Sequence, residues 1–179
     1  MVNKITQSGF SLAAALLLGL ALLTSAGARV FASADVTGLF REAASSASQL
    51  RRDTNQMAGF SKSRMSWESH AQQINQIKEH INNTGKVVAD LHDARDGAAA
   101  WQQEAIDRIT PLLQEIASNT ESVINHLNDR QHTWHPEYQE YLKSNAELAA
   151  DLSKLIGDYI DYDSAKARTQ ELQQKLGFS

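Results

Sequence analysis

Mostly apolar side chains recur every three or four residues in WESHAQQINQIKEHINNTGKVVADL, residues 67–91. The recurring positions are Trp67, His70, Ile74, Ile77, Ile81, Thr84, Val88 and Leu91. A repeat of about 3.5 residues is typical of a helix packed along its length against other helices. Two of these positions, His70 and Thr84, are polar. They mark where this helix departs from a purely structural pattern.

Three further segments carry the same repeat. The first is expected to be helical from about residue 36 to residue 61, with a stripe of Val36, Phe40, Ala43, Ala47, Leu50, Thr54 and Met57. The third carries Ile106, Ile109, Leu113, Ile116, Thr120, Val123 and Leu127. The fourth begins at His135-Pro136-Glu137 and carries Tyr138, Leu142, Asn145, Ala149, Leu152, Ile156 and Tyr159. Four similar stripes favour a bundle over a long two-stranded coiled coil.

Capping, turn and proline residues between these stripes set the expected topology. Ser66 is a natural N-cap for the second helix, and Asp96-Gly97 is a turn pair that ends it. Pro111 lies inside the third segment, where proline predicts a kink or a restart of the helix. Short connections join neighbouring helices in antiparallel fashion. The sequence therefore predicts an all-α, antiparallel up-down-up-down four-helix bundle, with residues 165–176 as a C-terminal helical extension or a short fifth helix.

The N-terminus has the pattern of a signal peptide. Lys4 precedes the apolar run Leu12–Leu23, and Ala32-Ser33-Ala34 offers a cleavage site before Asp35. The apolar run is shorter than the roughly 20 residues needed to span a bilayer, so a retained anchor is the lesser alternative. We therefore expect residues 1–34 to be a signal peptide and residues 35–179 a helical bundle domain. The expected location is periplasmic or secreted.

A second feature of this region competes with that interpretation. Gly9-Phe10-Ser11-Leu12 resembles the cleavage site of type IV pilin precursors, in which a long hydrophobic helix follows. In that family the fifth residue after cleavage is usually Glu, and here it is Ala14. Ala26-Gly27-Ala28 also interrupts the continuous helix that the resemblance implies.

Composition excludes several classes of function. The chain has no cysteine, which removes disulfides, lipid-modified cysteine, CxxCH haem attachment and thiolate zinc sites. Its formal charge of −4 becomes −6 without Lys4 and Arg29, which argues against nucleic acid or an anionic membrane as partner. No nucleophile elbow or phosphate-binding glycine loop is present. We expect a non-enzymatic binding or structural module without a cofactor, whose partner is another protein or a second copy.

Polar residues at core positions form one candidate feature. Counting residues from each turn places Thr54, Ile74, Thr120 and Asn145 near one height of the bundle. Such a layer either fixes helix register, at some cost in stability, or lines a small polar cavity.

Histidines at one end of the bundle give the alternative function. The turns after the first and third helices lie at the same end of an up-down bundle, and they bring together His70, His126, His132 and His135. Imidazole ligands with carboxylate support can bind zinc, copper or nickel without cysteine. The alternative is therefore a periplasmic metal-binding protein. The competing interpretation is that these histidines only hydrogen-bond and pack. His80 and His92 are expected at surface or flank positions.

The C-terminal segment is amphipathic. A candidate exposed apolar strip consists of Tyr159, Ile160, Tyr162 and Phe178, and Lys166, Arg168 and Lys175 are set opposite Leu172 and Leu176. Amphipathic exported helices of this kind bind partners or lipid surfaces. The simpler expectation is that both leucines pack back on the bundle or on a second copy.

Overall fold

The computed structural model describes residues 33–60 and 65–177, and within these residues it contains helices and no strand. The chain is therefore all-α, as its period of about 3.5 residues predicts. The elements are α2 (Ser33–Phe60), α3 (Trp67–Ala94), a 3₁₀ turn η1 (Arg95–Gly97), α4 (Ala100–Arg130) and α5 (Pro136–Leu176).

The helix ends follow local sequence signals. Ser66 caps α3, because its Oγ accepts a hydrogen bond of 3.4 Å from the backbone N–H of Ser69. Proline stands in the first turn of α5, where its missing N–H costs nothing. Pro111, in contrast, lies inside an unbroken α4. The helix α5 also continues without a break to Leu176, so residues 165–176 do not form a separate fifth helix.

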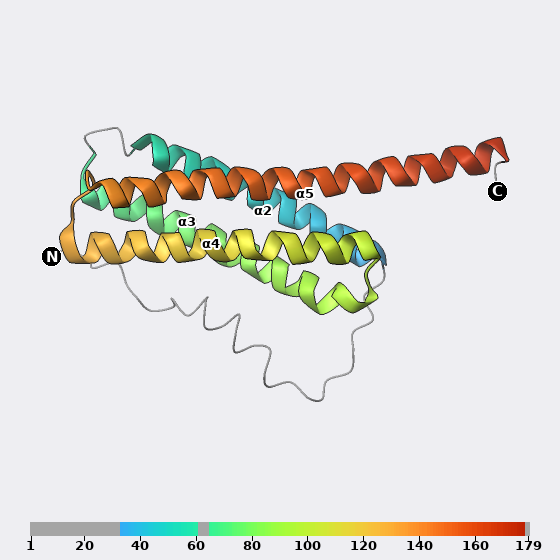
Figure 1. The fold of residues 1–179 in the computed structure, drawn as a ribbon, viewed down its shortest axis with the longest axis horizontal. Coiled ribbons are helices and arrows are strands. Elements are labelled where there is room, and N and C mark those ends of the chain that lie inside the picture. The colour runs from blue at the N-terminus through green and yellow to red at the C-terminus, as the bar shows by residue number, and fades with distance from the viewer. Residues whose placement is uncertain (1–32, 61–64, 178–179) are drawn as a thin grey trace, which may run out of the picture.

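The four helices pack as a ring of neighbours. The helix α2 packs against α3 and α5, and α4 packs against the same two (Figure 1). Nearly all the stripe positions are buried; among them only Trp67 and Tyr159 are partly exposed. The core therefore contains nearly all the residues that the repeat selects, together with neighbours such as Val87 and Ile124.

Buried polar side chains in this core bond mainly to their own helices. Thr54, Thr84 and Thr120 each donate to the backbone carbonyl four residues earlier, at 2.8–2.9 Å. One bond in the expected layer crosses between helices: Asn145 Nδ2 on α5 donates to Thr120 Oγ1 on α4 at 2.8 Å. This pair fits a register-fixing role, and Thr54 takes no part in it.

The last part of α5 lies apart from the other helices. Figure 1 shows it running beyond the ends of α2, α3 and α4. Residues 164–177 are all exposed. Leu172 and Leu176 keep 49% and 65% of their surface accessible, so the expectation that they pack back on the bundle is wrong.

The predictions for the N-terminus fall largely outside this description. Residues 1–32, which hold most of the predicted signal peptide and the pilin-like motif, are not among the described residues. Ser33 and Ala34 belong to the first turn of α2. Within residues 33–60 and 65–177, no helix is both long and apolar enough to cross a membrane.

Candidate functional site

Histidines gather at one end of the molecule. The chain passes from α2 to α3 and from α4 to α5 at this end (Figure 1). His70 lies in the first turn of α3, and His126 lies near the end of α4. His132 and His135 lie in the connection to α5, and Tyr138 lies in the first turn of α5. The sequence predicted this gathering of histidines without identifying its centre.

Tyr138 is the centre of the group. It is fully buried, and its hydroxyl hydrogen-bonds to Nδ1 of the equally buried His70 at 2.8 Å. Its ring centroid lies 5.2 Å from that of His126 and 5.8 Å from that of His70. Burial raises the pKa of Tyr138 and lowers the pKa of His70, because both charged forms lose hydration. The pair is therefore neutral tyrosine with neutral imidazole near pH 7.

His126, His132 and His135 are held by other contacts. Nε2 of His126 lies 2.8 Å from the backbone carbonyl of His132. Because a carbonyl only accepts, this nitrogen carries the proton. The ring of His126 packs against that of His135 at 5.3 Å, whereas the ring of His132 stacks on Trp134 at 5.3 Å.

These contacts bear on the metal-binding hypothesis. Two of the four predicted ligands, His70 and His126, contact the ring of Tyr138. His135 packs against His126, and the ring of His132 stacks on Trp134. Nε2 of His70 and Nδ1 of His135 are buried without a hydrogen-bond partner. Yet no three His, Asp or Glu side chains in the described ranges are arranged to hold a metal ion. The hypothesis therefore finds no ready ligand set in this part of the chain.

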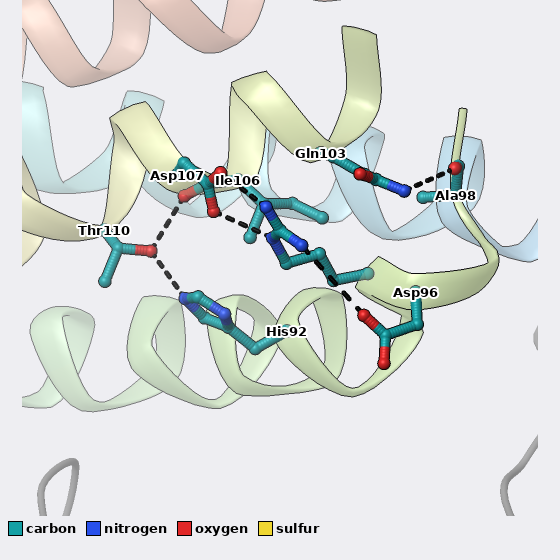
Figure 2. Close-up of polar contacts among 8 residues, drawn as sticks. His92, Asp96, Ala98, Gln103, Ile106, Asp107 and Thr110 are labelled. Atoms are coloured by element: carbon teal, nitrogen blue, oxygen red, sulfur yellow. Dashed lines mark hydrogen bonds and ion pairs between the residues drawn. The ribbon is translucent and has the colours of Figure 1, made fainter. Parts of the chain in front are cut away.

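The two histidines expected at surface or flank positions lie there, and each also joins two helices. His80 on α3 bonds through Nδ1 to the carboxylate of Asp53 on α2. Nε2 of His92 on α3 lies 2.8 Å from Oγ1 of Thr110 on α4 (Figure 2). Thr110 gives its own hydroxyl proton to the carbonyl of Ile106, so it accepts from His92. Both bonds lie on helix flanks, where the stripe pattern carries no signal.

The turn between α3 and α4 is tied by polar side chains (Figure 2). Nε and Nη2 of Arg95 donate to the two carboxylate oxygens of Asp107, at 2.8 and 2.7 Å. This hydrogen-bonded pairing lowers the pKa of Asp107. Gln103 Nε2 donates to the carbonyl of Ala98 at 3.0 Å. The contacts fix α4 relative to α3 at the end of the molecule opposite to the histidines.

Aromatic rings surround Trp101 at this second end. Trp101 lies in the first turn of α4 and stacks on Phe40 of α2 at 6.0 Å and on Tyr159 of α5 at 6.3 Å. Tyr162 meets it edge-on at 5.5 Å. An open groove of about 420 Å³ lies between α4 and α5 here, lined by Trp101, Glu104, Arg108, Leu155, Asp158, Tyr159 and Tyr162. The apolar repeat does not include Trp101, because this residue precedes the stripe of its helix.

The polar rim of this groove is close to neutral once Lys154, which pairs with Asp158, is counted. It carries two carboxylates, Glu104 and Asp158, and one cation, Arg108. Arg108 already pairs with Glu104 at 3.9 Å, and its Nη1 donates to the Tyr159 hydroxyl at 3.2 Å. The groove therefore offers apolar rings edged by paired charges.

An exposed stripe leads away from the groove along α5. Tyr162, Ala165, Thr169, Leu172 and Leu176 recur every three or four residues and are all exposed. The stripe that faces the bundle ends at Tyr159, and its next positions would be Asp163 and Lys166. The exposed stripe starts one residue earlier than that continuation, which turns it by about 100° around the helix. It therefore points to the side of the bundle's own seam.

Comparisons with protein-family models, with curated protein sequences and with solved structures give no match. The class of protein that fold and site define is an all-α helical bundle.

The pairing of His70 with Tyr138 predicts a pH dependence of stability. Burial lowers the pKa of His70 below its usual 6.5, so the unfolded chain takes up this proton at a higher pH than the folded chain. The contribution of His70 is therefore fully present above about pH 6.5 and is lost as the pH falls toward the folded-state pKa. We expect His70→Asn, whose amide can still bond Tyr138, to flatten this loss. Urea unfolding between pH 5 and 8 measures the slope; equal slopes in both proteins would contradict the role of His70.

Proposed function

We propose that this chain is an exported, non-enzymatic interaction module. In this proposal an antiparallel up-down-up-down bundle is the scaffold, and a C-terminal helical extension is the binding element. The short connections between successive helices and the ring of neighbouring contacts support the antiparallel arrangement. Export rests on the signal-peptide pattern of the first 34 residues.

The exposed stripe on α5 is the observation that carries this proposal. Almost every stripe position of the four helices is buried. The core of the scaffold is therefore complete without apolar side chains from the tail. Leu172 and Leu176 nevertheless remain about half or more exposed, as does Tyr162. Apolar side chains arranged at helix-seam spacing on an exposed face favour contact with another helix.

The polar contacts of the bundle support a scaffold role. Asn145 with Thr120, His80 with Asp53 and His92 with Thr110 each join two helices. His70 and Tyr138 likewise join α3 to α5. Each of these groups has a structural partner, which fits a rigid support for the tail.

Photo-crosslinking in the cells that export the protein tests the proposal. Gln173 borders the exposed stripe, whereas Gln174 lies on the opposite side of the tail. We expect benzoylphenylalanine at position 173 to give a discrete cross-linked protein after illumination, and the same group at position 174 to give much less. Adducts of equal yield at both positions, or none from position 173, would contradict an interaction role for this face.

A further inference from the structure

We propose that the exposed stripe of α5 binds the same stripe of a second copy of this chain, with the two tails antiparallel. The inference rests on the proposed function, since it names the partner of that binding face. In this arrangement the last turn of each tail reaches the aromatic groove of the other copy. The interface is then two-fold symmetric, and each contact is made twice.

Charge along the tail favours this partner and this direction. Residues 158–163 carry Asp158, Asp161 and Asp163, whereas residues 164–177 carry Lys166, Arg168, Lys175 and a single acid, Glu171. Antiparallel tails place the acidic block of one copy beside the basic block of the other. Parallel tails would place like charges side by side, which is destabilising.

The lengths of stripe and groove agree with the same arrangement. Leu155 and Tyr162 line the groove, and Leu176 lies at the far end of the stripe. Tyr162 and Leu176 are 14 residues apart, or about 21 Å along a helix. If Tyr162 of one copy lies opposite Leu176 of the other, the midpoint falls at Thr169.

In this register the last turn of α5 of one copy meets the groove of the other, and the groove suits that turn. Its rings offer an apolar surface for Leu176. The rim carboxylates Glu104 and Asp158 already pair with Arg108 and Lys154, so the fit of this end rests on the apolar rings. Leu155 and Tyr162 are seven residues apart, so both lie on the same face of α5 as the stripe. Groove and stripe therefore form one continuous surface for a second helix.

Sedimentation equilibrium of the protein recovered after export tests the association. We expect a reversible dimer with a dissociation constant on the order of tens of micromolar. Two tails that touch over about 21 Å of helix form a small interface, and small interfaces are weak. Leu172→Gln with Leu176→Gln should weaken dimerisation at least tenfold while the circular dichroism spectrum stays that of the wild type. The matched control is Ala167→Gln with Gln174→Ala on the opposite side, which should leave the dimer unchanged.

Single cysteines test the direction of the tails, since the natural chain has none. With a short bis-maleimide, Thr169→Cys should cross-link to itself. Asp161→Cys and Lys175→Cys should each fail alone and cross-link when mixed. Efficient self-linking of Asp161→Cys would overturn the antiparallel arrangement. A protein that stays monomeric at 200 µM would overturn the inference, and the proposed function would survive only if position 173 captures a different protein in cells.

Discussion

Tyr138→Ala is expected to lower the free energy of unfolding by about 4 kcal/mol, because removing a fully buried aromatic side chain typically costs 3–5 kcal/mol. Tyr138 is wholly inaccessible, and it touches the rings of His70 and His126. Its loss would leave a cavity at the junction of α3, α4 and α5. It would also leave Nδ1 of His70 buried without a partner, as Nε2 already is.

Tyr138→Phe separates the hydroxyl from the ring. The phenyl ring fills the same space, so only the 2.8 Å bond to His70 is lost. An unsatisfied buried polar group costs about 1–3 kcal/mol, and we expect a destabilisation in that range. Urea unfolding followed by circular dichroism measures both variants at pH 7.5. Trp134→Ala, at a site that is 70% exposed, is the control and should change stability by about 0.5 kcal/mol or less. If Tyr138→Ala and Trp134→Ala lower the free energy of unfolding by the same amount, Tyr138 is not the central packing residue of the histidine end.

The fold was predictable because one periodicity runs through all four helices. A repeat of about 3.5 residues selects one face of a helix, and burial follows that face almost without exception. Helix ends were predictable where a side chain fixes the backbone locally, as at Ser66 and Pro136. The start of α4 was not, since Ala100 has no capping side chain before it and lies ahead of the first stripe residue.

The histidine end was predictable in position and not in chemistry. Hairpin connections bring His70 and His126 to one end, whatever the rotation of each helix about its axis. Which of them contacts Tyr138 depends on that rotation, and stripe positions fix it only to within a residue. His80 and His92 bond at helix flanks for the same reason, so residue spacing could not distinguish these bonds from solvent exposure.

The aromatic end was visible in the sequence in part. Phe40 and Tyr159 stand at opposite ends of their stripes in chain order, which places them at one height in an antiparallel bundle. The shift of the apolar repeat between Tyr159 and Tyr162 is likewise a sequence feature. It marks where the apolar face of α5 turns to the side of the bundle's seam. Tyr162 on this face still contacts Trp101, and only the exposure of Leu172 and Leu176 shows that the face beyond it has no partner within the described chain.

Pro111→Ala is expected to raise the free energy of unfolding by about 2 kcal/mol. Pro111 lies inside α4 and is exposed, so its removal sacrifices little packing. Proline inside a helix costs about 3 kcal/mol relative to alanine, because it lacks the N–H that would bond the carbonyl of Asp107 and its ring crowds that carbonyl. Alanine gives back up to about 1 kcal/mol, since it makes the unfolded chain more flexible.

The other proline of the chain supplies the matched control. Pro136 occupies the first turn of α5, where no intrahelical bond is lost and the fixed backbone angle suits the helix. Pro136→Ala should therefore lower stability by about 0.5–1 kcal/mol, which is opposite in sign to Pro111→Ala. Thermal and urea unfolding of the two variants side by side measure the difference. If Pro111→Ala is instead destabilising, Pro111 must set the path of α4 that aligns Thr110 with His92 and Asp107 with Arg95. In that case Asp107→Asn should cost less in the Pro111→Ala background than in the wild type, because the bond to Arg95 would already be broken.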